Sequence, residues 1–168
     1  MTTPTTSRER NAPEPLTFYL DSSALVKRYM AEVGTAWVET LCADEDTHAI
    51  AIAHIGLVEV AAVFASKRRG RFITPAQCDN ALADLIQDAQ RRYQLAAVGP
   101  AVIDRAIQLT RRRKLRGYDA VHLACALTLN DPLVESGLSP LTFVSADDDL
   151  LAAAMAEGLA TDNPHNHP

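Results

Sequence analysis

The sequence predicts an α/β domain of three layers (α/β/α), with a central, mostly parallel sheet of four or five strands. Two patterns carry this prediction. Short apolar runs alternate with helix-length amphipathic runs, and the short runs show little alternation of apolar and polar residues. Strands covered on both faces have this continuous apolar pattern, and regular strand–helix alternation implies parallel pairing. With 168 residues, of which 48% are hydrophobic and 22% charged, the chain can bury one compact core.

The expected elements follow one another along most of the chain. Two helices have recognisable starts: Thr74 and Gln77 form a capping box with Pro75 at the first helical position, and Gly99-Pro100 opens a later helix. The strands are expected at LTFYL (16–20), HAIAI (48–52), LAAV (95–98) and LTFVS (141–145).

Both ends of the chain are expected to be disordered tails, over residues 1–15 and 161–168. They contain too few apolar side chains to offset the entropy that is lost when a segment becomes ordered. The ordered domain is therefore expected to cover residues 16–160.

Charge and composition exclude several classes of protein. Sixteen basic against twenty-one acidic residues give a net charge of −5, which argues against coating nucleic acid by bulk charge. No apolar run reaches the length of a membrane span, and residues 1–15 lack the apolar middle of a secretory signal, so we expect a cytoplasmic protein. Cys42, Cys78 and Cys125 have no disulfide or zinc spacing and are expected to be buried free thiols.

The informative residues are acids in apolar surroundings. Glu59 is the only formally charged residue within 47–66, and Asp119 is the only one within 117–130. A carboxylate in such surroundings is costly unless it is paired, hydrogen-bonded or bound to metal. A structural ion pair with an arginine is the main alternative for Glu59.

Two further acids follow expected strands directly. Asp21 comes after the first strand and Asp147 after the last one. The carboxyl ends of strands in an open parallel sheet are where ligands bind, so these acids and the two helical ones are in a position to converge there. Helix N-capping is an equally good reading of Asp21, Asp119 or Asp147 taken singly.

Four carboxylates in one place point to a divalent cation. Clustered carboxylates repel one another and stay ionised near neutral pH only when a cation occupies the site. Oxygen ligands favour Mg²⁺ or Mn²⁺ over zinc. Such an ion activates water and neutralises charge on phosphorus oxygens, which indicates phosphodiester hydrolysis or phosphoryl transfer.

Four segments carry a family resemblance: YLDSSALVKRY near the start, VEVA in the middle, RGYDAVHLACAL toward the end and FVSADDDLLAAA last. In order and approximate spacing they resemble the PIN domain family and, within it, the VapC toxin ribonucleases of type II bacterial toxin–antitoxin systems. The likeness covers about residues 16–160.

The resemblance implies a PIN-like fold and a Mg²⁺- or Mn²⁺-dependent endoribonuclease. Its catalytic, metal-binding acids map onto Asp21, Glu59, Asp119 and Asp147. Asp147 aligns best within the triple acid, and Asp148 is its substitute.

Three supporting residues match the same pattern. Ser23 is expected to support a carboxylate or the water shell of the metal, although a hydroxyl at a helix start is as good a reading. His122 is expected either to hydrogen-bond a carboxylate or to be a satisfied core histidine. Arg116, close in sequence to Asp119, is the candidate to touch a carboxylate or the scissile phosphate.

The resemblance also implies partners: an RNA substrate, a cognate VapB-like antitoxin and a second copy in a homodimer. Nine of the sixteen basic residues fall within 67–71 and 111–116, where they either guide RNA or form solvated helix ends. Four apolar residues are candidates for an antitoxin groove or for the core: Leu25, Val26, Tyr29 and Trp37.

Two other functions are compatible with parts of the pattern. A haloacid-dehalogenase-like phosphatase also has an Asp after its first strand, but a second Asp normally follows two positions later, where this chain has Ser23. A non-catalytic PIN-like binding module would keep the fold without turnover. The phosphatase does not account for Glu59, and the complete set of four acids argues against a decayed site.

Overall fold

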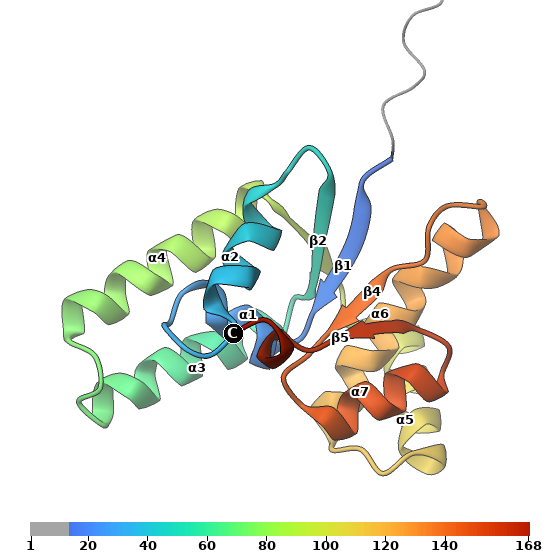
Figure 1. Cartoon of the computed structure of the whole chain (residues 1–168). Helices are drawn as coiled ribbons and strands as arrows, with labels where there is room; N and C mark the ends of the chain where they lie inside the picture. The colour runs from blue at the N-terminus through green and yellow to red at the C-terminus, as the bar shows by residue number, and fades with distance from the viewer. Residues whose placement is uncertain (1–13) are drawn as a thin grey trace, which may run out of the picture.

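The computed structural model describes residues 14–168, which form five strands, seven α-helices and two short 3-10 helices (Figure 1). The strands are β1 (Leu16–Leu20), β2 (His48–Ala53), β3 (Tyr93–Ala96), β4 (Thr142–Val144) and β5 (Ala160–Asp162). The helices are α1 (Ser22–Leu25), η1 (Val26–Arg28), α2 (Thr35–Ala43), α3 (Gly56–Arg69), α4 (Pro75–Arg91), α5 (Pro100–Arg112), α6 (Gly117–Glu135), α7 (Asp148–Ala156) and η2 (Pro164–Asn166).

The five strands form one sheet in the order β3-β2-β1-β4-β5, and every pair of neighbours is parallel. The chain builds outward from β1 through β2 to β3, and then returns to the other side of β1 with β4. The strand order therefore reverses between β1 and β4, which is the position where open parallel sheets bind ligands. The predicted parallel sheet is confirmed.

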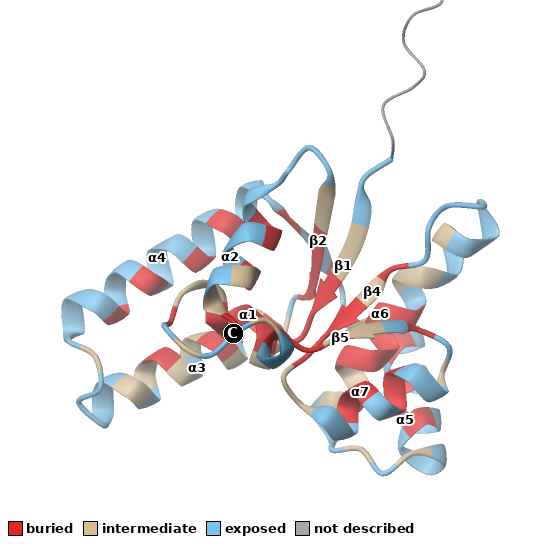
Figure 2. Ribbon diagram, viewed as in Figure 1, coloured by how far each residue is buried: buried red, intermediate tan, exposed pale blue. Residues whose placement is uncertain are grey.

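Helices cover both faces of this sheet, as the three-layer prediction requires. One core joins inward side chains such as Leu20 and Ile52 to α1, α2, α3 and α4. The other core joins Tyr19 and Phe143, which point to the opposite face, to α5, α6 and α7. Figure 2 shows buried residues along the strands and on the helix faces turned toward them, whereas the outer helix faces are exposed.

The two helix starts read from the sequence are confirmed. Thr74 accepts a hydrogen bond from the Gln77 amide while the Gln77 side chain accepts one from the Thr74 amide, with Pro75 at the first position of α4. Gly99 is the N-cap of α5. Helices α3 and α4 run side by side and project away from the sheet as a long hairpin (Figure 1).

The third strand begins two residues earlier than the expected 95–98. Helix α4 ends at Arg91, and Tyr93 opens β3 as a buried residue instead of extending the helix. The Tyr93 hydroxyl contacts the Tyr29 hydroxyl at 2.7 Å and donates to Asp88 at 3.4 Å. These hydrogen bonds hold Tyr93 at the start of β3. The apolar pattern of the sequence does not reveal them, because it says nothing of hydroxyl contacts.

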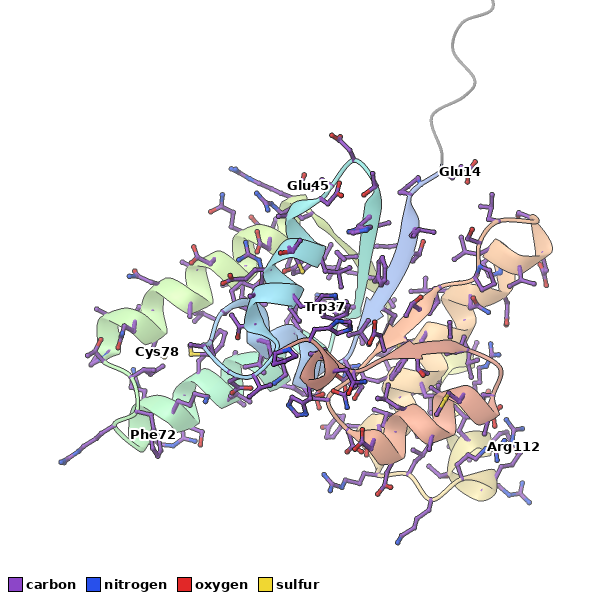
Figure 3. All side chains as sticks on the ribbon, viewed as in Figure 1. Glu14, Trp37, Glu45, Phe72, Cys78 and Arg112 are labelled. Atoms are coloured by element: carbon purple, nitrogen blue, oxygen red, sulfur yellow. The ribbon has the colours of Figure 1, made fainter. Side chains whose placement is uncertain are left out.

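The prediction of a disordered tail over 161–168 is wrong. Strand β5 pairs with β4, and Asn163 and Pro164 after it are buried. Gly34 has φ of 86°, and a Cβ there would lie 2.3 Å from the carbonyl oxygen of Pro164, so glycine is required for this approach. Trp37, labelled in Figure 3, belongs to α2. Its ring stacks on His167 with the ring centroids 4.2 Å apart.

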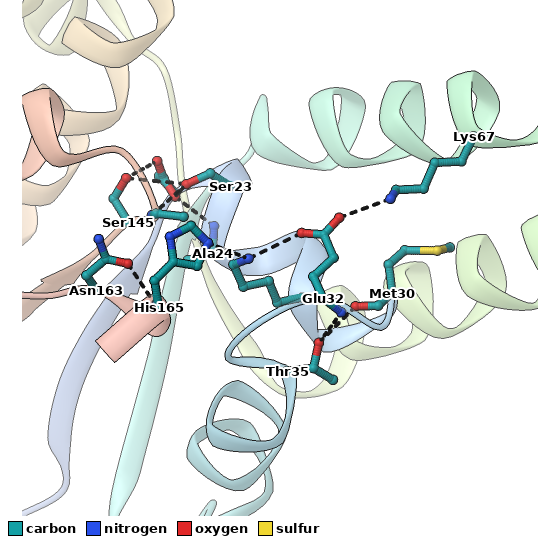
Figure 4. A network of polar contacts seen from close by, with 12 residues as sticks. Ser23, Ala24, Met30, Glu32, Thr35, Lys67, Ser145, Asn163 and His165 are labelled. Carbon is teal, nitrogen blue, oxygen red and sulfur yellow. Dashed lines mark hydrogen bonds and ion pairs between the residues drawn. The ribbon is translucent and has the colours of Figure 1, made fainter. Parts of the chain in front are cut away.

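Polar contacts, together with strand pairing, order this C-terminal segment. Lys27, whose side chain is almost completely buried, lies 3.2 Å from both Glu32 Oε2 and His165 Nε2. Figure 4 shows this chain of contacts continuing from Glu32 to Lys67. Because few apolar groups take part, the apolar pattern of the sequence gives no sign that the segment is ordered.

Three remaining expectations concern the rest of the chain. The expected tail at 1–15 lies outside the described residues except for Glu14 and Pro15. Cys42, Cys78 and Cys125 are buried free thiols, as predicted. Within the described part of the chain, no helix combines the length and apolar composition needed to cross a bilayer.

Candidate active site

The carboxyl ends of β1 and β4 bring the first and last candidate acids together at the point where strand order reverses. Asp21 follows β1, and its amide donates to Val144 O in β4 at 3.1 Å. The Ser145 hydroxyl then donates to Asp21 Oδ2 at 2.7 Å and accepts from the Asp147 amide at 3.0 Å. One serine therefore connects the two acid-bearing segments.

Asp21 is a buried carboxylate surrounded by hydrogen-bond donors. The Ser23 hydroxyl donates to Oδ1 at 2.7 Å, and the Ala24 amide donates to the same oxygen at 2.9 Å, so Asp21 also caps α1. Burial raises the pKa of Asp21, and this effect outweighs the lowering by the hydrogen bond from Ser145 and by the charge of His122. Ser23 supports a carboxylate, as the resemblance implies.

Glu59 lies in the first turn of α3 and faces the end of β1. Its Oε2 accepts from Ser22 Oγ at 2.5 Å and lies 2.6 Å from His122 Nε2. Burial alone would raise the pKa of Glu59, but the hydrogen bonds from His122 and Ser22 outweigh it, and the pKa is lowered. The partners of Glu59 are thus His122 and Ser22. The alternative of a structural ion pair with an arginine is not what the structure shows among the described residues.

Helix α3 packs closely against the residues that hold Glu59. A Cβ at Gly56 would lie 3.4 Å from His122 Cε1 and 3.5 Å from Ser22 Oγ, which is ordinary van der Waals contact. The first turn of α3 therefore lies directly beside His122 and Ser22.

His122 lies at the centre of the polar cluster. It is 3% exposed; its Nδ1 lies 3.0 Å from the Tyr19 hydroxyl, and its Nε2 contacts both Glu59 and Ser22. Burial raises the pKa of Tyr19 well above its usual value, so this hydroxyl stays protonated. His122 therefore contacts a carboxylate and is also a buried histidine whose two ring nitrogens both have partners.

Asp119 and Asp147 form the second side of the site. Burial and the negative charge of Asp147 raise the pKa of Asp119, and a backbone hydrogen bond and the charge of Arg116 offset part of this rise. Asp147 Oδ1 caps α7 by accepting from the Asp149 and Leu150 amides. Asp119 is not a cap, because Arg116 holds that position of α6.

Asp148 is turned to a different partner. Its Oδ1 accepts from Asn163 Nδ2 at 2.8 Å, which ties it to the C-terminal segment. The charge that acts on Asp119 is that of Asp147. This geometry favours Asp147 over its substitute.

A hollow of about 610 Å³ opens beside these acids, between the start of α3 and the start of α6. Its lining consists of Glu59, Arg116, Gly117, Tyr118, Asp119 and Val121. Two of the four candidate acids therefore face the same hollow, together with the candidate arginine.

Sequence reasoning missed three hydroxyl residues of the cluster. Ser22 supports Glu59, Ser145 supports Asp21, and Tyr19 contacts His122. Ser22 immediately follows Asp21 and Ser145 precedes Asp147 by two residues, so proximity to the acids was the available signal. Tyr19 carried no such signal, because a tyrosine in a buried strand reads as core.

Some of the basic residues within 67–71 and 111–116 form ion pairs with carboxylates. Lys67 pairs with Glu32, while Arg112 and Arg113 both pair with Glu157. Within residues 14–168, the other six have no carboxylate within 4.0 Å and are exposed: Arg68, Arg69, Arg71, Arg111, Lys114 and Arg116. Of the four groove candidates, Leu25 and Val26 belong to the core, and Tyr29 and Trp37 are partly buried.

The donor set fits a hard divalent cation. Among the described residues, no three His, Cys, Asp or Glu side chains lie close enough together to form a ready-made metal cluster. The neighbouring charges of Asp119 and Asp147, and the buried carboxylate of Asp21, nevertheless leave negative charge that the described side chains compensate only in part. Carboxylate oxygens of this kind suit Mg²⁺ or Mn²⁺.

Comparison with protein families decides the relationship. The model of the PIN domain matches residues 18–156. The chain belongs to the PIN domain family. Ribonuclease VapC45 and Ribonuclease VapC49, from two strains of Mycobacterium tuberculosis, are each 35% identical over 120 residues, which is 68% of this chain and 77% of theirs. The predicted resemblance to the PIN domain and its VapC proteins is confirmed.

Solved structures share the fold of this PIN domain. VapBC2 from Rickettsia felis, bound to a DNA fragment from its promoter, matches with a TM-score of 0.62 and 13% identity over 88% of this chain and 98% of that chain. PAE2754 from Pyrobaculum aerophilum matches with a TM-score of 0.60 and 19% identity over 98% and 95%. VapC20 of M. tuberculosis, a toxin that cleaves the sarcin–ricin loop, has a TM-score of 0.56 and 16% identity over 81% and 94%.

Proposed function

We propose that this PIN domain is a Mg²⁺- or Mn²⁺-dependent endoribonuclease, and that it acts as the toxin of a bacterial toxin–antitoxin pair. One observation carries the proposal. His122 contacts Glu59 directly and its charge acts on both Asp21 and Asp119, while the charge of Asp147 acts on Asp119, which supports a shared site for acids from four separate segments. The relatives named as VapC ribonucleases support the same activity.

The four acids have different tasks in this proposal. Asp21 is held by three donors and Glu59 by two, so both are oriented before any ligand arrives. When bound, a divalent ion supplies charge neutralisation at the phosphate and a lower pKa for the attacking water. Asp119 combines a raised pKa with a place in the hollow, and we assign it to accept the proton of that water.

Arg116 is assigned to the phosphate. It lies at the start of α6 in the wall of the hollow, and none of the described carboxylates pairs with its side chain. A guanidinium there can donate to phosphate oxygens as negative charge develops on them. The exposed arginines at 68–71 and 111–116 would add salt-dependent attraction to the RNA backbone.

The cognate antitoxin is proposed to bind away from the core residues Leu25 and Val26. A second hollow of about 510 Å³ lies between η1 and the α3–α4 hairpin, and its lining includes Tyr29, Met30, Phe72 and Ile73. Phe72, at the end of the hairpin, is 81% exposed (Figure 3). The rest of the lining is largely polar and includes Lys67, Gln77, Asn80 and Asp84. An amphipathic segment of a VapB-like protein would meet both kinds of side chain. The expected homodimer is part of the same proposal and can be tested by light scattering.

Cleavage of purified RNA tests the enzymatic proposal. The protein should cut RNA when Mg²⁺ or Mn²⁺ is added and lose this activity to a chelator. Asp21→Asn and Asp119→Asn should each abolish cleavage, whereas Asp104→Asn, an exposed acid on α5, should leave it unchanged. An Asp21→Asn protein that cuts as well as the parent would reject the catalytic assignment and favour a non-catalytic binding module.

Growth on induction tests the toxin role separately. Expression of the parent should arrest bacterial growth, and expression of Asp21→Asn should not. Co-expression of a small DNA-binding protein encoded next to the gene should restore growth to the parent. Arrest that persists with Asp21→Asn would show that toxicity does not come from this site.

A further inference from the structure

The hollow beside the acids has an aromatic wall that the proposed chemistry does not use. Tyr118 lines it together with Glu59 and Asp119, and the residue is 60% exposed. A volume of about 610 Å³ lies within the range of small-ligand sites. The hollow is continuous with the candidate site, because two of its walls are candidate acids.

The position of Tyr118 on α6 directs it toward this hollow. Residues four apart lie on the same helix face, so Tyr118 stands one turn before His122, which contacts Glu59 on α3. Among residues 14–168, no side chain stacks on Tyr118 or hydrogen-bonds with it. One face of a large aromatic ring is therefore left to a ligand.

The neighbours of Tyr118 leave room and supply charge. A Cβ at Gly117 would meet no atom within 4 Å, so the entrance beside the ring is open. Val121 adds an apolar wall, and Arg116 supplies a cation on the same side. A ligand that fits all of these has a flat aromatic part joined to an anionic part, which describes a nucleotide.

We propose that Tyr118 is a base-stacking platform, which holds the nucleobase next to the scissile phosphate while Arg116 contacts that phosphate. This inference rests on the proposed function. A base can lie flat on the ring only when it is unpaired and turned out of a helix. The site therefore takes single-stranded or loop RNA and discriminates against duplex RNA.

Kinetics of three variants test the platform. With Mn²⁺ and an unpaired RNA oligonucleotide, Tyr118→Ala should raise KM about 5- to 150-fold, the range expected for loss of one stacked base, with a smaller change in kcat. Tyr118→Phe keeps the ring and should retain the KM of the parent. Ile107→Ala removes an exposed apolar side chain on α5 and serves as the matched control.

Binding without turnover gives an independent readout. An oligonucleotide that carries 2-aminopurine is mixed with each protein in chelator, and fluorescence quenching reports stacking of that base. The parent and Tyr118→Phe should quench the signal and Tyr118→Ala should not. The same RNA annealed to its complement should be cut more slowly by the parent.

The outcomes separate the two proposals. If the parent cuts RNA but Tyr118→Ala shows the parent's KM and quenching, the platform is rejected and the ribonuclease stands. Equal cleavage of single-stranded and duplex RNA likewise rejects it. If the parent cuts no RNA with either metal, the proposed function fails, and the platform fails with it.

Discussion

The two sides of the candidate site are built differently. On one side, both carboxylate oxygens of Asp21 accept hydrogen bonds, from Ser23 and Ser145, and Oε2 of Glu59 accepts from Ser22 and His122. On the other side, Asp119 and Asp147 act on each other through like charge, and burial together with that charge raises the pKa of Asp119.

The difference shows how the site divides stability from function. Hydrogen bonds fix the orientation of the first pair, although burial still raises the pKa of Asp21. In the second pair, Asp147 Oδ1 also accepts from the Asp149 and Leu150 amides, but its charge still acts on Asp119, and a cation would relieve this repulsion. We expect loss of charge to lower activity on both sides. For stability, the sign follows the pKa shift: loss of charge should stabilise the fold at Asp119, whose pKa is raised, and destabilise it at Glu59, whose pKa is lowered.

The largest loss of activity should come from removing a charge from the pair Asp119 and Asp147. Asp147→Asn keeps the oxygen that accepts from the Asp149 and Leu150 amides, so α7 should keep its cap. RNA cleavage should nevertheless fall by more than the ~10–100-fold typical of losing an outer partner. Cleavage kinetics and a thermal melt measure the two effects.

Asp148→Asn is the matched control for that prediction. Asparagine can still accept the hydrogen bond from Asn163, and activity should stay within about twofold of the parent. If Asp148→Asn is inactive and Asp147→Asn active, the ligand assignment must be exchanged.

The support of Asp21 can be tested by removing the hydroxyl of Ser145. Ser145→Ala removes a donor to Asp21 and the acceptor of the Asp147 amide, and should lower activity or metal affinity about 10–100-fold. Ser66→Ala, an exposed serine on α3, should leave both unchanged. Calorimetric Mn²⁺ titration and cleavage rates measure the effect, and identical values for the two variants would show that Ser145 does not orient Asp21.

A smaller effect is expected at the C-terminal segment, where Asn163 hydrogen-bonds Asp148 at the start of α7. Asn163→Ala removes the donor to Asp148 and the acceptor of the His165 amide, and should cost about 1 kcal/mol. The melting temperature should fall by about 2–4 °C. The fluorescence of Trp37, the only tryptophan, reports whether His167 stays stacked on it.

Asn166→Ala is the control for that change, because the Asn166 side chain is exposed. Equal melting temperatures and fluorescence for Asn163→Ala and the parent would contradict a docked C-terminal segment.

The smallest effect should be a gain in stability. The folded-state pKa of Asp119 is raised above its ordinary value, so its charged form destabilises the folded protein at neutral pH, and this cost disappears as the pH falls through the raised pKa. In chelator at pH 7, Asp119→Asn should therefore melt about 1–4 °C higher than the parent, a range limited by solvent screening.

The pH dependence of this gain distinguishes charge from packing. Near pH 3, where Asp119 is protonated in both folded and unfolded chains, the melting temperatures of parent and variant should coincide. A variant that melts below the parent at pH 7 would contradict the repulsion between Asp119 and Asp147.

The sequence predicted the acids and the sheet for the same reason. Glu59 and Asp119 stand out because each is alone among apolar residues, and the strands stand out because they are apolar on both faces. Their order along the chain then led to the expectation that they meet at one edge of a parallel sheet.

What the sequence did not predict depends on polar contacts between distant residues. The hydrogen bond from Ser145 to Asp21 joins the ends of two neighbouring strands that lie 124 positions apart in the sequence. A serine has no pattern that distinguishes a buried donor from a surface hydroxyl. Residues 161–168 read as a tail because strand pairing and the contact of His165 with Lys27, rather than apolar burial, hold them in place.

A crystal grown with Mn²⁺ and measured for anomalous scattering tests the central claim most directly. The account predicts one or more strong peaks among the carboxylates of Asp21, Glu59, Asp119 and Asp147, with Asp119 and Asp147 drawn together and no peak in crystals of Asp119→Asn. The claim would be contradicted by a crystal grown with saturating Mn²⁺ that shows no peak among these four carboxylates. It would also be contradicted by a peak at Asp148 and the C-terminal histidines instead.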